Sequence, residues 1–382
     1  MVKRTLGEIE PPIGVLDELR ERAQREDLLD VAQGAPAYAT APSIVQRIRE
    51  VASDPNGAKY TDGRGLPALR EELARDLSQD YSAQLSTENV LISSGSNQAF
   101  CLAVSALAEP GDEVIVTVPY YFNHDMWIRL DGLRPIYVDT SSTTGQVAVE
   151  DVARKVTKRT RMIVVTSPGN PTGVTASSEV LEELANLARD KQLVLVLDET
   201  YRTFRPNPNV PAHGLFQRSD WTEYLVSLHS FSKDFAIPGY RVGALVGSSL
   251  LLGEAMKLMD CVAICAPRIG QEAALEALRS AGEWRVGRAT EARIKLDRFR
   301  QIMAGSPGGF DLSLSGGFYG WVAHPDSTSG TPAVIRRLAL ECGVLAISGT
   351  VFTPEDRGFI RVGFANIESD QIDELARRLA GY

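Results

Sequence analysis

A lysine, Lys233, lies among hydroxyl and glycine residues in the segment 228–243, and Arg241 follows it eight positions later. The amine of a lysine forms a Schiff base with a carbonyl group, and surroundings that favour its neutral form make it reactive. A tight turn beside small polar side chains suits this chemistry, although a lone lysine in such a turn is more often a solvated surface residue. A chemical role for Lys233 therefore depends on partners elsewhere in the chain.

Two other segments could meet a phosphate and a flat ring. Residues 94–99, Ser-Gly-Ser-Asn-Gln-Ala, open a helical pattern after an apolar run. Glycine lets a ligand approach the backbone, and the first turn of a helix favours a phosphate, although an ordinary helix cap accounts for the same residues. Residues 119–124, Pro-Tyr-Tyr-Phe-Asn-His, follow the next apolar run. Their aromatic rings could stack on a ligand or could form a cluster in the core.

Two more segments end in groups that could bind a heterocycle. The amide of Asn170 could donate to a ring oxygen, or the segment 167–173 could be an ordinary turn. Asp198 ends an apolar run, and a carboxylate beside a heterocyclic nitrogen keeps that nitrogen protonated, although helix caps also use aspartate. Tyr201 could donate to a phenolic oxygen. Together with Lys233, these groups match one ligand, pyridoxal phosphate, which carries a phosphate, a flat ring, a basic nitrogen, a ring oxygen and an aldehyde.

The elements around these segments are predicted to bring them together. Short β-branched runs alternate with helical patterns from residue 89 onward, as in βαβ units. The expected strands are 90–93, 113–118, 136–138, 162–166, 193–197, 224–228 and 242–246. This pattern predicts an α/β fold with a mainly parallel seven-stranded sheet. Ligands bind beyond the carboxyl ends of such strands, which is where the polar segments occur.

The length of 382 residues exceeds the usual size of a single core, so two domains are expected. Helical patterns cover 14–26, 42–52, 66–77 and a long stretch from 270 to about 302. Short apolar runs at 344–347 and 359–362, with helices at 332–342 and from 370, indicate a smaller α+β domain. We predict a large cofactor domain of residues 36–275 and a small domain of residues 1–35 and 276–382.

Composition argues against several kinds of partner. The net charge is −9 without a basic run, so the long-range field repels nucleic acid and anionic membranes. Four cysteines are too few for a disulfide framework, and Cys261 and Cys265 lack the second ligand pair of a zinc site, so no metal is expected. No stretch approaches the ~20 apolar residues that span a bilayer, and the N-terminus has no apolar signal core. We predict a cytoplasmic protein.

Five segments, taken in order, resemble the motif set of a known family. They are Ser-Gly-Ser-Asn at 94–97, Pro-x-Tyr-x-Asn-His at 119–124, Asn-Pro-Thr-Gly at 170–173, Asp-Glu-x-Tyr at 198–201 and Ser-x-Ser-Lys-x-Phe-x-x-x-Gly-x-Arg-x-Gly at 230–243. The set is similar to that of the fold-type I, aspartate-aminotransferase-like pyridoxal-phosphate enzymes of class I and II. The resemblance implies an aminotransferase that moves an amino group between an L-amino acid and a 2-keto acid.

The resemblance also implies roles around the cofactor ring. Lys233 would form the internal aldimine and carry protons, and Asp198 would face the pyridinium nitrogen with His124 supporting it. Tyr121 would stack on the ring. The ring's phenolic oxygen would be held by Asn170 and Tyr201.

At the two ends of the site, the resemblance implies binding of a phosphate and of a carboxylate. The phosphate ligands would be Ser96, Asn97, Ser230 and Arg241. Tyr60 resembles the family tyrosine that reaches the phosphate of the neighbouring subunit, which implies a homodimer with shared active sites. Arg361 would clamp the α-carboxylate of the amino acid, with the backbone of Gly34 and the side chain of Asn170 beside it.

Two questions stay open at this level. The same carbanion chemistry also serves elimination enzymes, cyclases and synthases of this family, so a lyase is the alternative to an aminotransferase. The substrate side chain is not defined either: Glu8 and Glu10 would suit a cationic side chain, whereas Arg268 would suit a carboxylate. The family's commoner Gly-Glu-Pro also appears here as Gly-Ala-Pro at 34–36, which leaves the entrance chemistry undefined.

Overall fold

Seven strands form the central sheet of the computed structural model, which describes residue 9, residues 11–24 and residues 26–382. The strand order is β2 (Val90–Ser93), β8 (Gly243–Val246), β7 (Leu225–Ser230), β6 (Val194–Asp198), β5 (Thr160–Thr166), β3 (Glu113–Val118) and β4 (Arg134–Asp139). Strand β8 runs antiparallel to both of its neighbours, and the pairs from β7 to β4 are parallel. The predicted mainly parallel seven-stranded sheet is therefore confirmed.

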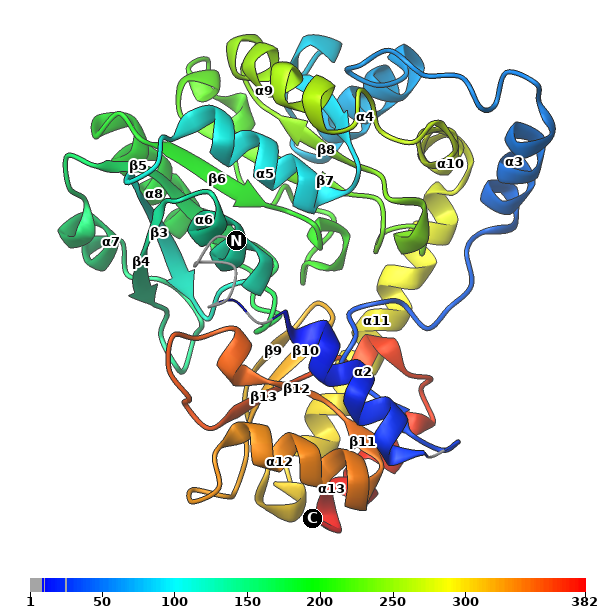
Figure 1. Ribbon diagram of the computed structural model, residues 1–382, viewed down its shortest axis with the longest axis vertical. Coiled ribbons are helices and arrows are strands. Elements are labelled where there is room, and N and C mark those ends of the chain that lie inside the picture. Colours follow the sequence, from blue (N-terminus) through cyan, green and yellow to red (C-terminus); the bar gives the residue numbers. More distant parts are fainter. Residues whose placement is uncertain (1–8, 10, 25) are drawn as a thin grey trace, which may run out of the picture.

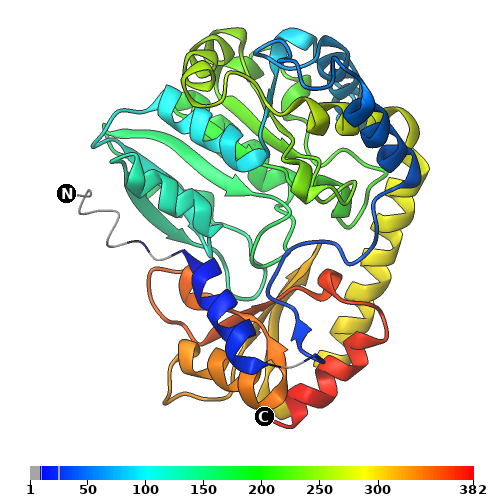
Figure 2. The same cartoon turned by 45° about the vertical axis from the view of Figure 1, so that its right-hand side comes forward.

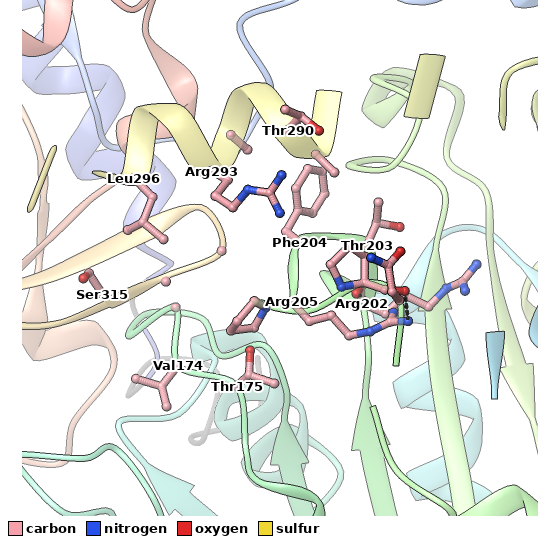
Figure 3. A pocket seen from close by; sticks show the side chains of 18 of the residues that line it. Val174, Thr175, Arg202, Thr203, Phe204, Arg205, Thr290, Arg293, Leu296 and Ser315 are labelled. Carbon is pink, nitrogen blue, oxygen red and sulfur yellow. Dashed lines mark hydrogen bonds between the residues drawn. The ribbon is translucent and has the colours of Figure 1, made fainter. Parts of the chain in front are cut away.

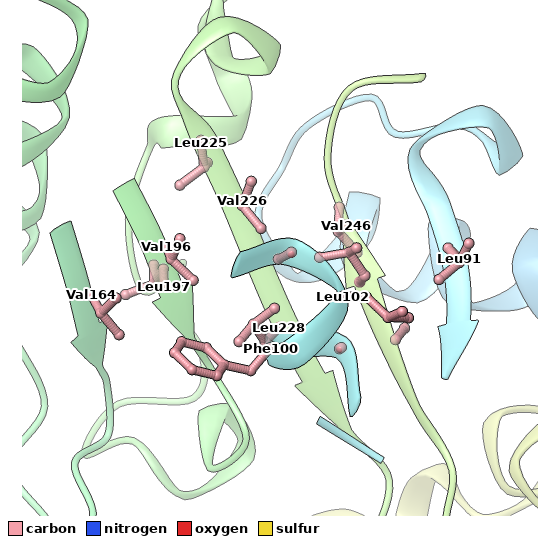
Figure 4. Packing of buried hydrophobic residues seen from close by; sticks show 14 of the residues in the cluster. Leu91, Phe100, Leu102, Val164, Val196, Leu197, Leu225, Val226, Leu228 and Val246 are labelled. Atoms are coloured by element: carbon pink, nitrogen blue, oxygen red, sulfur yellow. The ribbon is translucent and has the colours of Figure 1, made fainter. Parts of the chain in front are cut away.

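Helices lie on both faces of this sheet (Figure 1). They are α3 (Pro42–Ser53), α4 (Pro67–Asp80), α5 (Ser96–Leu107), α6 (Phe122–Leu130), α7 (Val149–Lys155), α8 (Ser178–Asp190), α9 (Ser249–Val262) and α10 (Arg268–Ser280). Every residue of β2, β3, β7 and β8 is buried, which explains why β2, β3 and β8 appear in the sequence as mainly apolar runs without alternation. Figure 4 shows Phe100 and Leu102 of α5 packed over strand residues such as Leu228.

A second body lies below the first in Figure 1 and contains two small sheets. Strands β12 (Ile347–Ser348), β13 (Phe359–Val362), β10 (Tyr319–Ala323) and β9 (Asp311–Gly316) form an antiparallel sheet in that order. The early strand β1 (Leu29–Asp30) pairs in parallel with the late strand β11 (Val344–Leu345). The helices of this body are α2 (Pro12–Ala23), α12 (Thr331–Arg337) and α13 (Gln371–Ala380). The N-terminal and C-terminal parts of the chain thus fold together.

Two separate clusters of buried apolar side chains support the two bodies. The first extends along the chain from Ala41 to Ala281. The second joins Leu16, Leu19 and the β1 region to residues between Ala292 and Leu379, and it also includes Tyr201 and Phe204 from the segment after β6. The long helix α11 (Gly282–Met303) runs along both bodies in Figures 1 and 2. The domain limits proposed from the sequence, with a boundary at residue 275, stay a prediction.

The backbones of the two bodies approach each other directly at a pair of glycines, Gly173 and Gly316. A Cβ atom on Gly173 would lie 2.0 Å from the carbonyl oxygen of Gly316, and a Cβ atom on Gly316 would lie 2.3 Å from the carbonyl oxygen of Gly173. Gly173 also has a φ of +74°, which side chains rarely adopt. Glycine is therefore required at both positions for this approach.

Several helices differ from the expected pattern. The single stretch predicted from 270 to 302 is two helices, because Ala281 leaves the helical conformation (φ −108°, ψ 25°) immediately before Gly282. The helix expected at 14–26 ends earlier, at Ala23, where Gln24 turns to a positive φ of 47°. Helices α6 and α9 were not predicted: α6 is short and begins among the aromatic residues of the 119–124 segment. No helix in the described part of the chain is both long and apolar enough to span a membrane.

Candidate active site

One cavity of about 490 Å³ collects nearly all of the residues singled out in the sequence. It lies between the carboxyl ends of the parallel strands and the small antiparallel sheet. Lining residues follow within a few positions of the ends of five strands: β2, β3, β5, β6 and β7. The predicted residues that line it are Gly34, Ser96, Asn97, Tyr121, Asn170, Asp198, Tyr201, Ser230, Lys233, Arg241 and Arg361. The fold therefore assembles a single site from segments that are far apart in the sequence.

A larger cavity, of about 880 Å³, lies elsewhere and contains none of these residues. Figure 3 shows it between α11, with Arg293 and Leu296, and the turns that carry Val174 and Arg205. Its buried arginines are already paired: Arg202 with Asp76 and with Asp80 at 2.7 Å, and Arg205 with Asp80 at 2.5 Å. The larger cavity therefore holds none of the groups that the sequence indicates for chemistry.

Lys233 follows β7 by three residues and faces the cavity. No carboxylate of the described residues forms an ion pair with its amine. Burial, and then the neighbouring guanidinium groups of Arg361 and Arg241, lower the pKa of Lys233 to about 8 from its ordinary 10.5. The structure thus supplies the environment that favours a neutral, nucleophilic amine.

This depressed pKa predicts a pH-dependent cost to folding. In the cofactor-free protein the amine is charged below pH 8 in both the folded and unfolded states, and the folded state disfavours that charge. We expect Lys233→Met to raise the free energy of unfolding by about 2 to 3 kcal/mol at pH 7. The difference in unfolding free energy between the variant and the wild type should shrink as the pH rises from about 8 to about 10. In that range the wild-type amine is already neutral in the folded state. Urea unfolding of both proteins at pH 7 and pH 10 measures this, with Lys257→Met on the exposed face of α9 as the control.

Asp198 is the last residue of β6 and is almost completely buried. Its Oδ2 lies 3.1 Å from Nε2 of His124, and its Oδ1 accepts the backbone N–H of Thr200 at 3.0 Å. The ring of Phe100 stacks on His124 with centroids 4.0 Å apart. His124 does not line the cavity but lies behind Asp198, so it can fix the orientation of the carboxylate that faces the cavity.

The start of α5 and the segment after β7 form an end of the cavity suited to an anion. Gly95 has a φ of +86°, and a Cβ atom there would lie 2.6 Å from Nη2 of Arg241. The following helix directs its first N–H groups to this end, where Ser96 and Ser230 add hydroxyl groups. Thr200 donates from Oγ1 to Oγ of Ser96 at 3.0 Å and so holds one of these hydroxyls.

Arg361 lies on β13 and is also buried. Its Nη1 donates to Oδ1 of Asn170 at 2.7 Å, and its Nη2 donates to the carbonyl oxygen of Ala32. The guanidinium lies over the rings of Tyr319 and Phe352, 4.5 Å and 5.1 Å from their centroids. Its Nε is buried and has no hydrogen-bond partner among the described residues. A buried cation with an unpartnered donor at a cavity wall is a suitable site for a carboxylate.

Tyr319 is a residue of this site that sequence reasoning did not assign. Its hydroxyl is hydrogen-bonded to that of Tyr201, and it leaves no room for a side chain at Gly34, where a Cβ atom would overlap the Tyr319 oxygen. Burial raises the pKa of both tyrosines, so the hydroxyl groups stay protonated at neutral pH. The Gly-Gly-Phe-Tyr-Gly-Trp run at 316–321 was a visible signal, but nothing in it indicated which element it would face.

Some predicted residues lie away from the cavity. The Tyr60 side chain is 73% exposed and does not line the cavity of its own chain. Arg268 donates from Nε to the carbonyl oxygen of Lys59 at 3.0 Å and pairs with Glu272 at 3.4 Å, also outside the cavity. Glu8 and Glu10, considered for the substrate side chain, lie outside the described residues.

Comparison with known proteins gives a consistent result over nearly the whole chain. Residues 26–379 match the family described as aminotransferase class I and II. The chain is 30% identical to the arginine–pyruvate transaminase AruH of Pseudomonas aeruginosa, over 94% of this chain and 90% of that protein. It is 28% identical to an aromatic aminotransferase of Arabidopsis thaliana, over 99% and 94% of the two chains. The aspartate aminotransferase of Thermus thermophilus with maleate superposes with a TM-score of 0.90 at 27% identity, over 100% and 99% of the two chains.

Proposed function

The chain belongs to the class I and II aminotransferases, which depend on pyridoxal phosphate, and from this premise we propose that Lys233, Asp198 and Arg361 carry its reaction. The enzyme moves an amino group between an amino acid and a 2-keto acid. The observation that carries the assignment of residues is that one cavity holds an amine with a depressed pKa, a buried carboxylate and a buried guanidinium with an unpartnered nitrogen.

The side chains of the cavity fit the cofactor group by group. We propose that its phosphate is bound by the first turn of α5 together with Ser96, Asn97, Ser230 and Arg241. Asp198 would accept a hydrogen bond from the ring nitrogen, and Tyr121 would cover one face of the ring. Asn170 and Tyr201 would donate to the phenolic oxygen. The close approach of Arg241 to Gly95 supports this arrangement, because it directs a cation to the same end as the helix N-terminus.

When bound, pyridoxal phosphate supplies an aldehyde for covalent attachment of the amino group and a ring that accepts electrons. In our proposal the Nζ of Lys233 takes the proton from the α-carbon of the amino acid, for which a pKa near the operating pH is favourable. Asp198 would face the ring nitrogen with its carboxylate, and His124 holds that carboxylate in place. Tyr121, Tyr201 and Tyr319 surround the reacting centre and limit its contact with water.

Arg361 is proposed to bind the α-carboxylate of both substrates. A guanidinium can offer two parallel N–H groups to a carboxylate, whereas an ammonium cannot. We therefore expect Arg361→Lys to raise KM for amino acid and keto acid about 10- to 100-fold, with a smaller fall in kcat, when initial rates are measured over a range of both substrates. Equal KM values for the variant and the wild type would contradict the assignment. Arg357→Lys, on the exposed turn before β13, serves as the matched control.

The reaction is tested by incubating the holoenzyme with a panel of amino acids in the absence of a keto acid. An aminotransferase converts its bound cofactor once, to pyridoxamine phosphate, and then stops until a 2-keto acid is added. An elimination or cyclisation enzyme, the alternative left open by the sequence, would release ammonia or a cyclised product catalytically. Catalytic release without a keto acid would therefore overturn aminotransfer as the main activity.

We also propose that two copies of the chain form a homodimer with shared active sites. Support comes from the exposed face that carries Tyr60, Val262 and Ile264, which are 73%, 70% and 42% exposed. The Tyr60 segment is held against the start of α10, a few residues after Ile264, because Arg268 donates to the carbonyl oxygen of Lys59 and Gln271 donates to Oγ1 of Thr61. Sedimentation equilibrium should give twice the chain mass of 41.6 kDa, and a particle of the single mass would contradict the proposal. The cytoplasmic location stays a prediction.

A further inference from the structure

A second cavity, of about 380 Å³, lies directly beside the active site. Its walls come from α2 of the second body, from α6 of the first body, which holds the seven-stranded sheet, and from the segment around β12. Four residues line both cavities: Pro12, Leu16, Phe122 and Ile347. The two spaces are therefore neighbours that share a wall of apolar side chains.

The shared wall lies next to the arginine proposed to bind the substrate carboxylate. Ile347 of β12 is paired with Arg361 of β13 in the antiparallel sheet, and directly paired residues project from the same face with Cβ atoms about 5 Å apart. On the other side, the ring centroid of Phe352 lies 5.1 Å from the guanidinium carbon of Arg361 and 5.7 Å from the ring centroid of Phe122. A group attached close to a carboxylate on Arg361 would thus meet Ile347 and Phe122 at the entrance to the second cavity.

The second cavity is lined mainly by apolar groups. Besides the shared residues, these are Ile9, Val15, Leu19, Tyr120, Met126, Pro332, Ile335 and Val351. Four charged residues of both signs also line it, and three of them are already partnered: Asp125 and Arg129 pair with each other at 3.5 Å, and Glu18 pairs with Arg22 at 2.9 Å. Arg336 is exposed on the outer helix α12. A lining that is mainly apolar, with its ion pairs already formed, favours an uncharged group over a second carboxylate.

We propose that this second cavity receives the side chain of the amino-acid substrate, and that the substrates are amino acids with large apolar side chains, aromatic or long aliphatic. The inference rests on the proposed function, because it assumes that the α-carboxylate binds to Arg361. The volume lies within the roughly 300–1,000 Å³ of typical ligand pockets, so it can hold any such side chain. The side chain would contact both bodies, since α2 and α6 face each other across the cavity.

The first experiment measures single-turnover kcat/KM of the holoenzyme, from the absorbance change of the bound cofactor, for phenylalanine, leucine, methionine, alanine, aspartate and glutamate. Burial of a large apolar side chain should favour phenylalanine and leucine over alanine by about 10- to 100-fold. Aspartate and glutamate should fall at least about tenfold below phenylalanine. A preference for the dicarboxylic amino acids, or equal values for alanine and phenylalanine, would overturn the inference.

A second experiment fills the cavity away from the active site. Met126 and Val351 line the second cavity only, so Met126→Trp should lower the ratio of kcat/KM for phenylalanine over alanine at least about tenfold. Val351→Trp provides the same test from another wall if Met126→Trp folds poorly. Ile294→Trp, on the exposed face of α11 and outside both cavities, is the matched control and should keep the wild-type ratio. An unchanged ratio in both cavity variants would exclude the second cavity as the side-chain pocket.

Binding of unreactive acids separates this inference from the reaction itself. The affinities of 3-phenylpropionate, propionate and succinate for the holoprotein can be compared by calorimetry. We expect 3-phenylpropionate to bind at least about tenfold more tightly than the other two, and to lose that advantage in Met126→Trp. If no amino acid reacts but this order is found, the proposed function fails while the apolar pocket stands. If amino acids react but succinate binds most tightly, the pocket assignment alone fails.

Discussion

Replacing Lys233 with alanine is expected to lower kcat for aminotransfer at least about 1,000-fold. The variant loses the amine that moves the α-proton, and proton transfer by a positioned side chain alone is worth about 10²- to 10⁴-fold. It also loses the group that attaches the cofactor covalently. The measurement is the steady-state rate with the best amino acid of the panel, together with mass spectrometry after borohydride reduction, which should place the cofactor on the Lys233 peptide of the wild-type protein only.

Lys257→Ala is the matched control for this experiment, because Lys257 lies on α9 and pairs with Glu254 at 2.7 Å outside the cavity. It should retain the wild-type rate and the reduced cofactor adduct. An adduct found on another lysine, or a Lys233→Ala enzyme within about tenfold of the wild-type rate, would show that the amine of Lys233 is not the reactive group.

Replacing Asp198 with asparagine is expected to lower kcat about 100- to 1,000-fold. The amide has nearly the same shape but no negative charge, so it does not favour a protonated ring nitrogen, and loss of one preorganised electrostatic group at a reacting centre typically costs this much. The effect should fall on kcat more than on KM, because the charge acts on the reaction and not on the carboxylate clamp. Steady-state kinetics at saturating cofactor measures both constants.

Asp198→Glu separates loss of charge from a change of shape, since it keeps the carboxylate; it should recover part of the lost rate. Asp190→Asn, at the exposed end of α8, controls for a general effect of removing one aspartate and should leave the kinetics unchanged. A wild-type kcat in Asp198→Asn would contradict the role given to this carboxylate, whatever the affinity for the cofactor.

The strands of the large sheet could be predicted because burial on both faces leaves a continuous β-branched run, as in β3. Lys233 and Asp198 could be placed at strand ends for the same reason. The helix α9 was missed, although Ser248 caps it by accepting the N–H of Leu251 at 3.2 Å. Capping of this kind occurs at turns as well as at helices, so a serine before a leucine run does not separate the two.

Contacts between the two bodies could not be predicted in the same way. Tyr319 meets Tyr201 across 118 positions, and Arg361 meets Asn170 across 191. The periodicity of a sequence indicates which side of a helix or strand is buried, but not which other element packs against that side. These two pairs therefore depend on how the antiparallel sheet of the second body packs against the first body. The second cavity is a further case, because α2 and α6 become its walls only when the N-terminal segment folds onto the C-terminal part of the chain.

The backbone contact between Gly173 and Gly316 has a geometrical consequence for the whole enzyme. Neither glycine carries a side chain that could change rotamer. Any relative motion of the two bodies that keeps this contact is therefore a rotation about the contact point. Displacement then grows with distance from the glycines. The side chain of Arg361 is hydrogen-bonded to Asn170, which lies three positions from Gly173 in the sequence. Arg361 is therefore among the residues that such a rotation displaces least. In such a rotation Arg361 and Asn170 keep their relative positions. The width of the cavity farther from the glycines, by contrast, changes with the rotation angle.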